Sequence, residues 1–377
     1  MHCRWHLPLL SSLILASGSS AAESKHGKRL VILDNDWETV GFPVFLPVLA
    51  SDMEVLGLTA VTADTWQPQG ALHALATLEL GNLSSCIPVY EGATWPLINT
   101  PERFTTWQEN HGVLPFSGAF GVYNATREAE GHDPTGGNPN RIVKQAFYEG
   151  FPKGTPNKSM TAAEFMVQSV KKYPGQVSIF AAGSLTNVAL AIRIDPDFPL
   201  FAKELVIMGG FVDFGLRGVI DPIQAGFYED INFKIDPEAA KIALTANFSS
   251  ITIGGNVANQ VISSPEFLEE VDQVKNPYSD LFLQVYHKTF PFWDETTALI
   301  MVDPTLSINQ TEVYIDVDTA YDSPFYGNLV VYNKQYAPAH AGKAIYVNEV
   351  NATEVKKRIK SALQYPKACK DLNYGHH

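Results

Sequence analysis

Residues 29–38 read RLVILDNDWE, an apolar run that stops at two aspartates and a glutamate. A continuous apolar run of this length is typical of a strand buried on both faces. Similar runs occur at 54–64, 87–90, 176–182, 204–208 and 249–253, and helical patterns occur between them at 71–80, 162–172, 185–192 and 237–245. This alternation predicts an α/β domain with a mostly parallel central sheet and helices on both faces.

The rest of the chain departs from this alternation in two places. Residues 116–159 are rich in Gly, Pro, Asn and charge, which predicts an insertion that runs over the surface. A small C-terminal antiparallel set and a closing helix are expected at 313–318, 329–332, 344–347 and 352–363. Because no repeat or linker divides the chain, we expect one domain over residues 28–368 and a short tail at 369–377.

The charge balance narrows the class of ligand. The chain has 27 Lys and Arg residues against 40 Asp and Glu residues, a formal net charge of −13. Such a surface repels nucleic acid polymers and anionic membranes, so a small molecule is the expected partner. The sequence lacks G-x-G-x-x-G, G-x-x-x-x-G-K-[ST], G-x-S-x-G, H-E-x-x-H and C-x-x-C, which disfavours dinucleotide oxidoreductases, P-loop NTPases, serine hydrolases and zincins.

Residues 1–22 have the pattern of a signal peptide. Arg4 precedes an apolar run at 7–16, and small residues continue to Ala22. The apolar run is too short to span a bilayer, which needs about 20 such residues. We therefore expect a mature protein that is secreted and extracellular.

Sequons and cysteines agree with that destination. Six N-x-[ST] sequons predict a glycoprotein, although a chain of this length produces some by composition alone: Asn82, Asn124, Asn157, Asn247, Asn309 and Asn351. Once Cys3 leaves with the signal peptide, Cys86 and Cys369 remain. An oxidising compartment favours their pairing, but the sequence leaves open whether the two thiols meet.

Carboxylates gather where the apolar runs stop. Asp34 and Asp36 lie two residues apart, hence on one side of the strand, and Glu38 follows in the loop. Asp64 ends the second run, and Asp294 opens an apolar helical stretch. Ligands of open α/β sheets bind at the carboxyl ends of strands, and Ca²⁺ prefers clustered oxygen ligands. The alternatives are a strand-end turn in which aspartates accept backbone hydrogen bonds and, for Asp294, a helix N-cap.

The order of these pieces resembles the nucleoside hydrolase family, the inosine-uridine-preferring nucleoside N-ribohydrolases, over about residues 29–363. The landmarks are the segments 31–36, 56–59, 111–112, 183–187, 208–210 and 236–240, together with Asn232, Asp294 and Asp303-Pro304. The resemblance implies a single α/β domain, a Ca²⁺ bound in a pocket at the strand ends, a nucleoside as partner and the possibility of a homodimer.

The resemblance also implies roles for individual residues. Asp36, Asp294 and the main-chain carbonyl of Ala182 match calcium ligands of the family, and Asp34 is a further candidate on the same strand. The implied contacts with substrate are Asn232 with the ribose hydroxyls, Asp230 in place of a glutamate at the 5′-hydroxyl, Met208 under the sugar and His111 near the base. A lone histidine such as His111 is also compatible with a purely structural role.

The sequence departs from the family pattern at the general base. The family opens with D-x-D-x-x-x-D-D, whose last two carboxylates supply the base and a bidentate calcium ligand. Those positions are Val40 and Gly41 here, and neither side chain can accept a proton or bind a metal. Asp64 stands where the family usually has Asn, and Trp293 replaces a histidine. We therefore expect Asp64, or failing that Glu38, to act as the general base.

These features predict hydrolysis of the N-glycosidic bond of ribonucleosides, through a water held by Ca²⁺. Trp37, Trp66 and Trp293 each lie beside a site carboxylate in the sequence, so they either stack on a base, which slightly favours purines, or are core aromatics. The missing carboxylates leave two alternatives open. One is a catalytically impaired extracellular protein that binds nucleosides or sugars, and the other is an enzyme for a different N- or O-glycoside.

Overall fold

The computed structural model describes residues 29–212, 230–286 and 288–372 of the chain. The expected signal peptide, residues 1–22, and the end of the expected tail lie outside these ranges. Within them, no helix combines the length and the apolar character that crossing a membrane requires.

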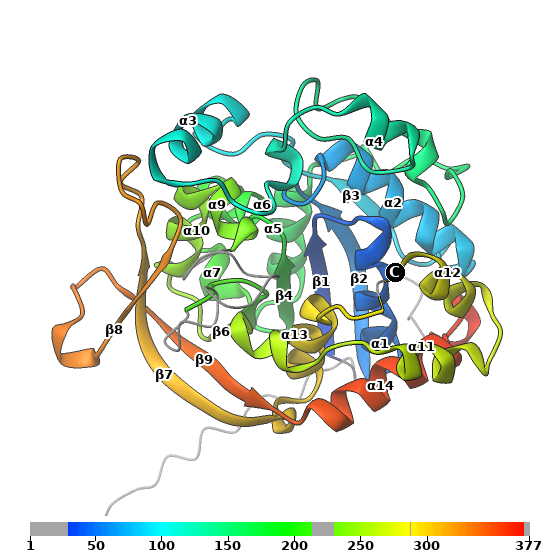
Figure 1. Cartoon of the computed structure of the whole chain (residues 1–377). Coiled ribbons are helices and arrows are strands. Elements are labelled where there is room, and N and C mark those ends of the chain that lie inside the picture. Colours follow the sequence, from blue (N-terminus) through cyan, green and yellow to red (C-terminus); the bar gives the residue numbers. More distant parts are fainter. Residues whose placement is uncertain (1–28, 213–229, 287, 373–377) are drawn as a thin grey trace, which may run out of the picture.

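The strands of the described chain form a nine-stranded sheet in the order β3-β2-β1-β4-β5-β6-β9-β7-β8 (Figure 1). Neighbouring strands from β3 to β9 are parallel, whereas β7 runs antiparallel to both β9 and β8. The strands are β1 Arg29–Asn35, β2 Met53–Ala60, β3 Val89–Glu91, β4 Val177–Ala182, β5 Glu204–Ile207, β6 Ile251–Ile253, β7 Ser307–Val317, β8 Leu329–Tyr332 and β9 Gly342–Val350.

Helices cover both faces of this sheet. The main ones are α1 Phe45–Leu49, α2 Gln67–Leu80, α3 Pro101–His111, α4 Ala125–Ala129, α5 Ala162–Lys172, α6 Thr186–Ile194, α7 Phe198–Phe201, α9 Ile231–Ile235, α10 Pro237–Leu244, α11 Pro265–Asp272, α12 Pro277–Val285, α13 Trp293–Val302 and α14 Ala352–Gln364. Several helices start with strong signals, such as the capping box of α5 between Thr161 and Glu164.

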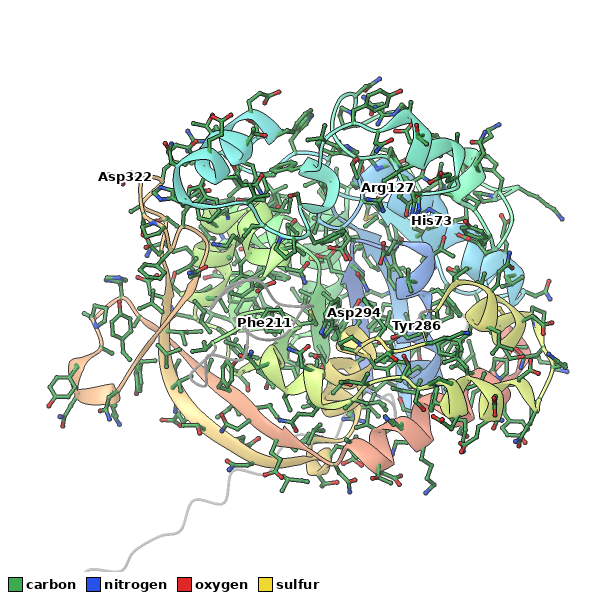
Figure 2. The ribbon with its side chains drawn as sticks, in the orientation of Figure 1. His73, Arg127, Phe211, Tyr286, Asp294 and Asp322 are labelled. Atoms are coloured by element: carbon green, nitrogen blue, oxygen red, sulfur yellow. A yellow bond between two sulfur atoms is a disulfide. The ribbon has the colours of Figure 1, made fainter. Side chains whose placement is uncertain are left out.

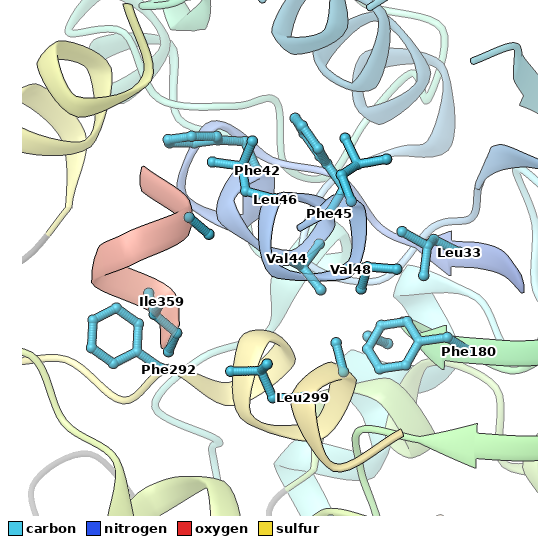
Figure 3. Packing of buried hydrophobic residues seen from close by; sticks show 14 of the residues in the cluster. Leu33, Phe42, Val44, Phe45, Leu46, Val48, Phe180, Phe292, Leu299 and Ile359 are labelled. Carbon is cyan, nitrogen blue, oxygen red and sulfur yellow. The ribbon is translucent and has the colours of Figure 1, made fainter. Parts of the chain in front are cut away.

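Strand β1 separates two apolar cores. Its residues Val31 and Leu33 pack into a cluster with α1, α2, α13 and α14, while the alternate residues Leu30 and Ile32 pack into a second cluster with α5, α6 and α10. Figure 3 shows Leu33 in the first cluster, together with residues of α1 and α13. A strand buried on both faces reads as a continuous apolar run, which is why the sequence pattern was strong here.

The architecture confirms the predicted α/β class, with a mostly parallel sheet and helices on both faces. The C-terminal antiparallel strands extend the main sheet, because β9 pairs in parallel with β6 on its other side. Strand β7 begins earlier than the expected residue 313. Residues 308–312 are exposed, and all of them except Ile308 are polar, so they carry no apolar alternation from which a strand could be predicted.

Segment 116–159 passes over α2 and contributes to the interior as well as to the surface (Figure 1). Phe120 packs against the ring of Trp66, with ring centroids 5.8 Å apart. Phe147 stacks on the ring of His73 in α2 at 4.1 Å. The segment is therefore attached to the domain by buried aromatic contacts at two points.

The two cysteines whose pairing the sequence left open form a disulfide. Cys86 and Cys369 are bonded, with their Cα atoms 5.9 Å apart. The bond joins the turn after α2 to the short helix η7 (Cys369–Asp371), which follows α14. It thus connects segments that are 283 residues apart in the chain.

Candidate active site

A pocket opens where strands β1, β2, β4 and β5 end and the chain leaves the sheet. Carboxylates form part of its wall, apolar and aromatic side chains form most of the rest, and the described residues that line it include no Lys, Arg or His. The lining residues are Asp36, Glu38, Val40, Gly41, Asp64, Leu114, Pro115, Phe116, Ala182, Met208, Phe211, Asp230, Ile231, Asn232, Tyr286, Phe290, Pro291, Trp293, Asp294 and Glu295.

Three aspartates are joined through the end of β1. The backbone N–H of Asp64 donates to Asp36 Oδ2 at 2.7 Å, which ties the loop after β2 to the end of β1. Asn35 Nδ2 donates to Asp294 Oδ2 at 2.8 Å, which ties in the first turn of α13. Asp294 does not cap α13, because the N-cap residue is Phe292. The three aspartates therefore lie together at one edge of the sheet.

Close packing after β4 brings its end against the same aspartate. Ala182 is the last residue of β4 and pairs in register with Asn35 of β1. A Cβ atom on the next residue, Gly183, would lie 2.7 Å from Val61 Cγ1 and 3.0 Å from the backbone N of Asp36. Only glycine fits at this position, so β4 ends directly beside Asp36.

The acidic side of the pocket is electrostatically unfavourable without compensation. Burial is the largest cause of raised pKa values among its carboxyls: about 6 for Asp230, about 7 for Asp36, about 8 for Glu38 and Glu295, and well above the usual range for Asp64 and Asp294. The charge of Asp36 adds to the effect of burial at Asp64 and Asp294. Either protons or a cation must therefore balance this group of carboxylates.

The donor chemistry of the site fits a hard cation. Asp64 Oδ1 is buried and has no hydrogen-bond partner, and Asp36, Asp294 and Ala182 supply further oxygen atoms in the same pocket. Nevertheless, the described residues contain no set of three or more His, Cys, Asp or Glu side chains already arranged to hold a metal ion. The oxygen atoms are thus of the type that binds a hard cation, but the described side chains do not form a complete set of metal ligands.

A second group of polar residues lies after β5. Asp230 caps α9 by accepting the backbone N–H of Asn232 at 3.0 Å, and it also accepts the backbone N–H of Gly210. Asn232 Nδ2 donates to the carbonyl oxygen of Met208 at 3.1 Å. Gly209 and Gly210 both have positive φ, and a Cβ atom on Gly209 would lie 2.9 Å from Asp230 Oδ2, so the chain that leaves β5 passes close to the Asp230 carboxylate.

Comparison with known proteins identifies the family. A sequence model described as "Inosine-uridine preferring nucleoside hydrolase" matches residues 31–357. The chain belongs to the nucleoside hydrolase family. An uncharacterized protein of Schizosaccharomyces pombe is 32% identical to it, covering 96% of this chain and 91% of its own. A probable uridine nucleosidase of Oryza sativa is 29% identical over 68% of this chain and 67% of its own.

A solved structure shows the same fold as this chain. It is a plant nucleoside hydrolase, which superposes with a TM-score of 0.68 at 22% identity and covers 90% of this chain and 99% of its own. The fold that the resemblance implied is therefore confirmed.

Most residues expected at the site line the pocket. Asp36, Asp294 and Ala182, expected as metal ligands, do so, as do the two expected bases Asp64 and Glu38. Met208, Asp230, Asn232 and Trp293, expected to contact substrate, line it as well. Trp293 is held there by a hydrogen bond from its Nε1 to Asn259 Oδ1 at 2.6 Å.

Four expected site residues are not among the described residues that line the pocket. Asp34 is buried beneath it, where it accepts hydrogen bonds from Thr59 and Asn187. Trp37 and Trp66 are core residues, the first donating to the carbonyl of Thr59 and the second packing on Phe120. His111 ends α3 in an exposed position, with its ring 5.5 Å from that of Trp107.

Sequence reasoning missed several residues of the pocket. Glu295 is buried in the wall beside Asp294, and its position next to Asp294 is the sequence feature that could have indicated it as a site residue. Phe211 and Tyr286 also line the pocket, and Figure 2 shows Asp294 between them. Aromatic residues in loops carry no motif, so their role becomes visible only when the chain is folded. The residues after His111 were also missed. Leu114, Pro115 and Phe116 line the pocket, whereas His111 is not among the described lining residues.

Proposed function

We propose that this nucleoside hydrolase cleaves the N-glycosidic bond of ribonucleosides to give ribose and the free base. The observation that carries the proposal is the meeting of Asp36, Asp64 and Asp294, from three separate segments, in one pocket with Asp230 and Asn232. The reaction passes through an oxocarbenium-like ribosyl cation, and fixed negative groups around the sugar stabilise such a charge.

Asp64 is the group that we assign as the general base. Its Oδ1 is buried, has no hydrogen-bond partner and belongs to a residue of the pocket wall. This oxygen would take the proton of the attacking water while the bond from the Asp64 N–H to Asp36 holds the backbone in place. Glu38, which also lines the pocket, is the second candidate for this role.

Ca²⁺ is the cofactor that we propose. When bound, it supplies positive charge that holds ribose hydroxyls and makes a water more acidic. The carboxylates of Asp36 and Asp294 and the carbonyl of Ala182 would hold it. Asn35 orients Asp294 by donating to one of its carboxylate oxygens, which leaves the other free for a ligand.

The remaining walls provide for the sugar and the base. Asp230 and Asn232 present hydrogen-bonding groups for ribose hydroxyls beside Met208. Phe290 and Trp293, whose ring centroids lie 4.8 Å apart, offer aromatic surface for the base. A purine presents more surface for such contacts than a pyrimidine, which supports a slight purine preference. The description of the rice relative as a probable uridine nucleosidase makes uridine the necessary comparison.

One feature of the pocket favours a second candidate function. Val40 and Gly41 line the wall where the family resemblance implies two carboxylates. Among the described residues, a Cβ atom at Gly41 would have only Glu38 Cγ within 4 Å, at 3.9 Å, so Val40 and Gly41 supply no carboxylate and the acidic side chain beside Gly41 is that of Glu38. A protein that binds nucleosides or sugars with little or no turnover is therefore the second candidate.

A reducing-sugar assay with metal analysis separates the candidates. The purified protein is tested on inosine, adenosine, guanosine and uridine, with and without a chelator. We expect ribose release that the chelator abolishes and added Ca²⁺ restores. Nucleoside binding in calorimetry without ribose release would favour the binding protein, and absence of both would contradict both candidates.

We also propose that the mature protein is a secreted glycoprotein. The Cys86–Cys369 disulfide is typical of oxidising compartments. The asparagines of five sequons are exposed, and that of Asn157 is half-buried, so the sites are accessible to glycosylation. The homodimer that the resemblance implies stays a prediction.

A further inference from the structure

A buried charged cluster lies behind one wall of the pocket, outside the residues assigned to the reaction. His73 of α2 stands between two carboxylates of segment 116–159. Its Nε2 lies 2.8 Å from Asp133 Oδ1, and its Nδ1 lies 2.5 Å from Glu149 Oε1. The side chains of His73 and Glu149 are fully buried, and that of Asp133 is 15% exposed.

The geometry fixes the charge of this cluster. Each ring nitrogen lies within hydrogen-bond distance of a carboxylate oxygen, an arrangement that suits an imidazolium ring in which both nitrogens donate. Burial alone would lower the pKa of His73, but the charges of Asp133 and Glu149 and their hydrogen bonds outweigh it and raise the pKa to about 10. Phe147 stacks on the ring and shields it from solvent.

The cluster reaches the pocket through one hydroxyl group. Thr39 Oγ1 lies 3.2 Å from Glu149 Oε2, 3.2 Å from His73 Nδ1 and 3.1 Å from the carbonyl oxygen of Ala146. Thr39 is the first residue of the short helix η1 (Thr39–Val44) and directly follows Glu38. The same turn carries Val40 and Gly41 into the pocket wall. The Thr39 hydroxyl therefore connects the cluster to the turn that bears three lining residues.

Helix α2 holds this arrangement against the back of the site. A Cβ atom on Gly70 would lie 3.0 Å from the carbonyl oxygen of Trp37 and 3.2 Å from that of Asp36, so the helix packs directly on the chain that leaves β1. Gln69, which directly precedes Gly70, donates from Nε2 to Asp133 Oδ1 at 2.8 Å, and His73 contacts the same segment 116–159 from the next turn of the helix. The helix, the turn and the segment thus meet at this cluster.

A buried ionic cluster usually contributes little net stability compared with apolar side chains of the same volume, because desolvation offsets the attraction. It does impose one arrangement on its partners, since each charge must keep its hydrogen bonds. We propose that His73, Asp133 and Glu149 are positioning residues that act through Thr39 to fix the turn of residues 38–41. Segment 116–159 is then a working part of the pocket, because it supplies two of the three charged groups. The inference rests on the proposed function for the reaction that this turn serves.

The test compares two threonines of similar burial. Thr39→Val removes the hydroxyl that joins the turn to the cluster while keeping the shape of the side chain. The matched control is Thr77→Val in α2, where the hydroxyl bonds only backbone carbonyl groups of its own helix. Thr39→Ser keeps the hydroxyl and should rescue. Glu149→Gln removes the charge that faces Thr39, and provides a second, independent perturbation.

Two measurements are made on each full-length variant. We expect Thr39→Val and Glu149→Gln to lower kcat by about tenfold or more, with KM within about threefold, because misplacement of a site by a fraction of an ångström has effects of this order. In the same variants, amide hydrogen exchange over residues 38–44 should accelerate. Thr39→Ser and Thr77→Val should retain wild-type values in both measurements.

Exchange keeps this inference separate from the proposed function. If the wild type hydrolyses no nucleoside, the proposed function fails, and exchange over residues 38–44 alone decides the positioning role. Unchanged exchange and kcat in Thr39→Val and Glu149→Gln would overturn the inference. Equal changes in Thr77→Val would also overturn it, because they would show general loosening of the fold.

Discussion

Asp64 is expected to matter for turnover and not for binding. Asp64→Asn keeps the size of the side chain but replaces the proton-accepting carboxylate with an amide. The kcat should fall by about 10²- to 10⁴-fold, the usual contribution of a general base. The affinity for nucleoside, measured by calorimetry, should change by less than about threefold. The melting temperature should not fall, because burial already raises the pKa of this carboxyl and disfavours its charge.

Asp322→Asn is the matched control for that substitution, since Asp322 is exposed in the connection between β7 and β8, away from the pocket (Figure 2). It should retain wild-type kcat. Full activity in Asp64→Asn would remove Asp64 from the mechanism, and the role of base would pass to Glu38, tested by Glu38→Gln.

The raised pKa of His73 makes the stability of the folded state depend on pH in the alkaline range. Its pKa rises from 6.5 to about 10 on folding, so the folded state binds this proton more tightly than the unfolded chain does. That stabilisation is complete below about pH 6.5 and is lost as the pH rises through about 10. The melting temperature should therefore fall more between pH 7 and pH 10 in the wild type than in the variant H73Q/D133N/E149Q, whose cluster is uncharged. Parallel pH profiles in the two proteins would contradict the assigned charge.

Some site residues could be read from the sequence and others could not. Asp36 was predictable because a carboxylate directly after a buried strand must lie at the carboxyl edge of the sheet. Trp37 follows it, yet its ring turns into the core and donates to Thr59, because adjacent residues of an extended chain point in opposite directions. Phe211 and Tyr286 had no signal, since the residues that complete a pocket come from loops distant in the chain.

The disulfide is the element-scale feature with the clearest consequence for stability. Cys86 and Cys369 close a very long loop, and removing such a bond typically costs about 2–5 kcal/mol. The Cys86→Ala/Cys369→Ala variant should melt several degrees lower in a thermal scan. Because neither residue lines the pocket, kcat at a temperature well below melting should be unchanged. An unchanged melting temperature would show that packing of α14 alone holds this end of the chain.

Element boundaries were least predictable where the chain serves the site. The apolar run 54–64 reads as one strand, but β2 ends at Ala60. Val61 still bonds to the carbonyl oxygen of Asn35, and the chain then leaves the sheet and brings Asp64 into the pocket. Residues 61–63 are buried after β2 has ended, and their small or apolar side chains therefore look like a continuation of the strand. The sequence pattern therefore indicates correctly that residues 61–63 are buried, but they are buried outside strand β2.

At the scale of the molecule, the fold class followed from local pattern, whereas strand order did not. A buried parallel strand shows a continuous apolar run and an amphipathic helix shows a helical period, so each can be recognised from its own residues. Pairing between β6 and β9 joins residues about 90 positions apart, such as Thr252 and Ile345, and no local pattern encodes it. The candidate site shows the same division: carboxylates at the strand ends could be predicted from the sequence, but the distances between them depend on the packing of three segments.

The position of β9 has a consequence for synthesis. Strand β9 lies between β6 and β7, yet it is the last of the nine strands to be made. A nascent chain that has emerged only as far as β8 has nothing to which β7 and β8 can attach, and the exposed edge of β6 stays unpaired. The polypeptide must therefore keep that edge from pairing with other chains until its final residues leave the ribosome.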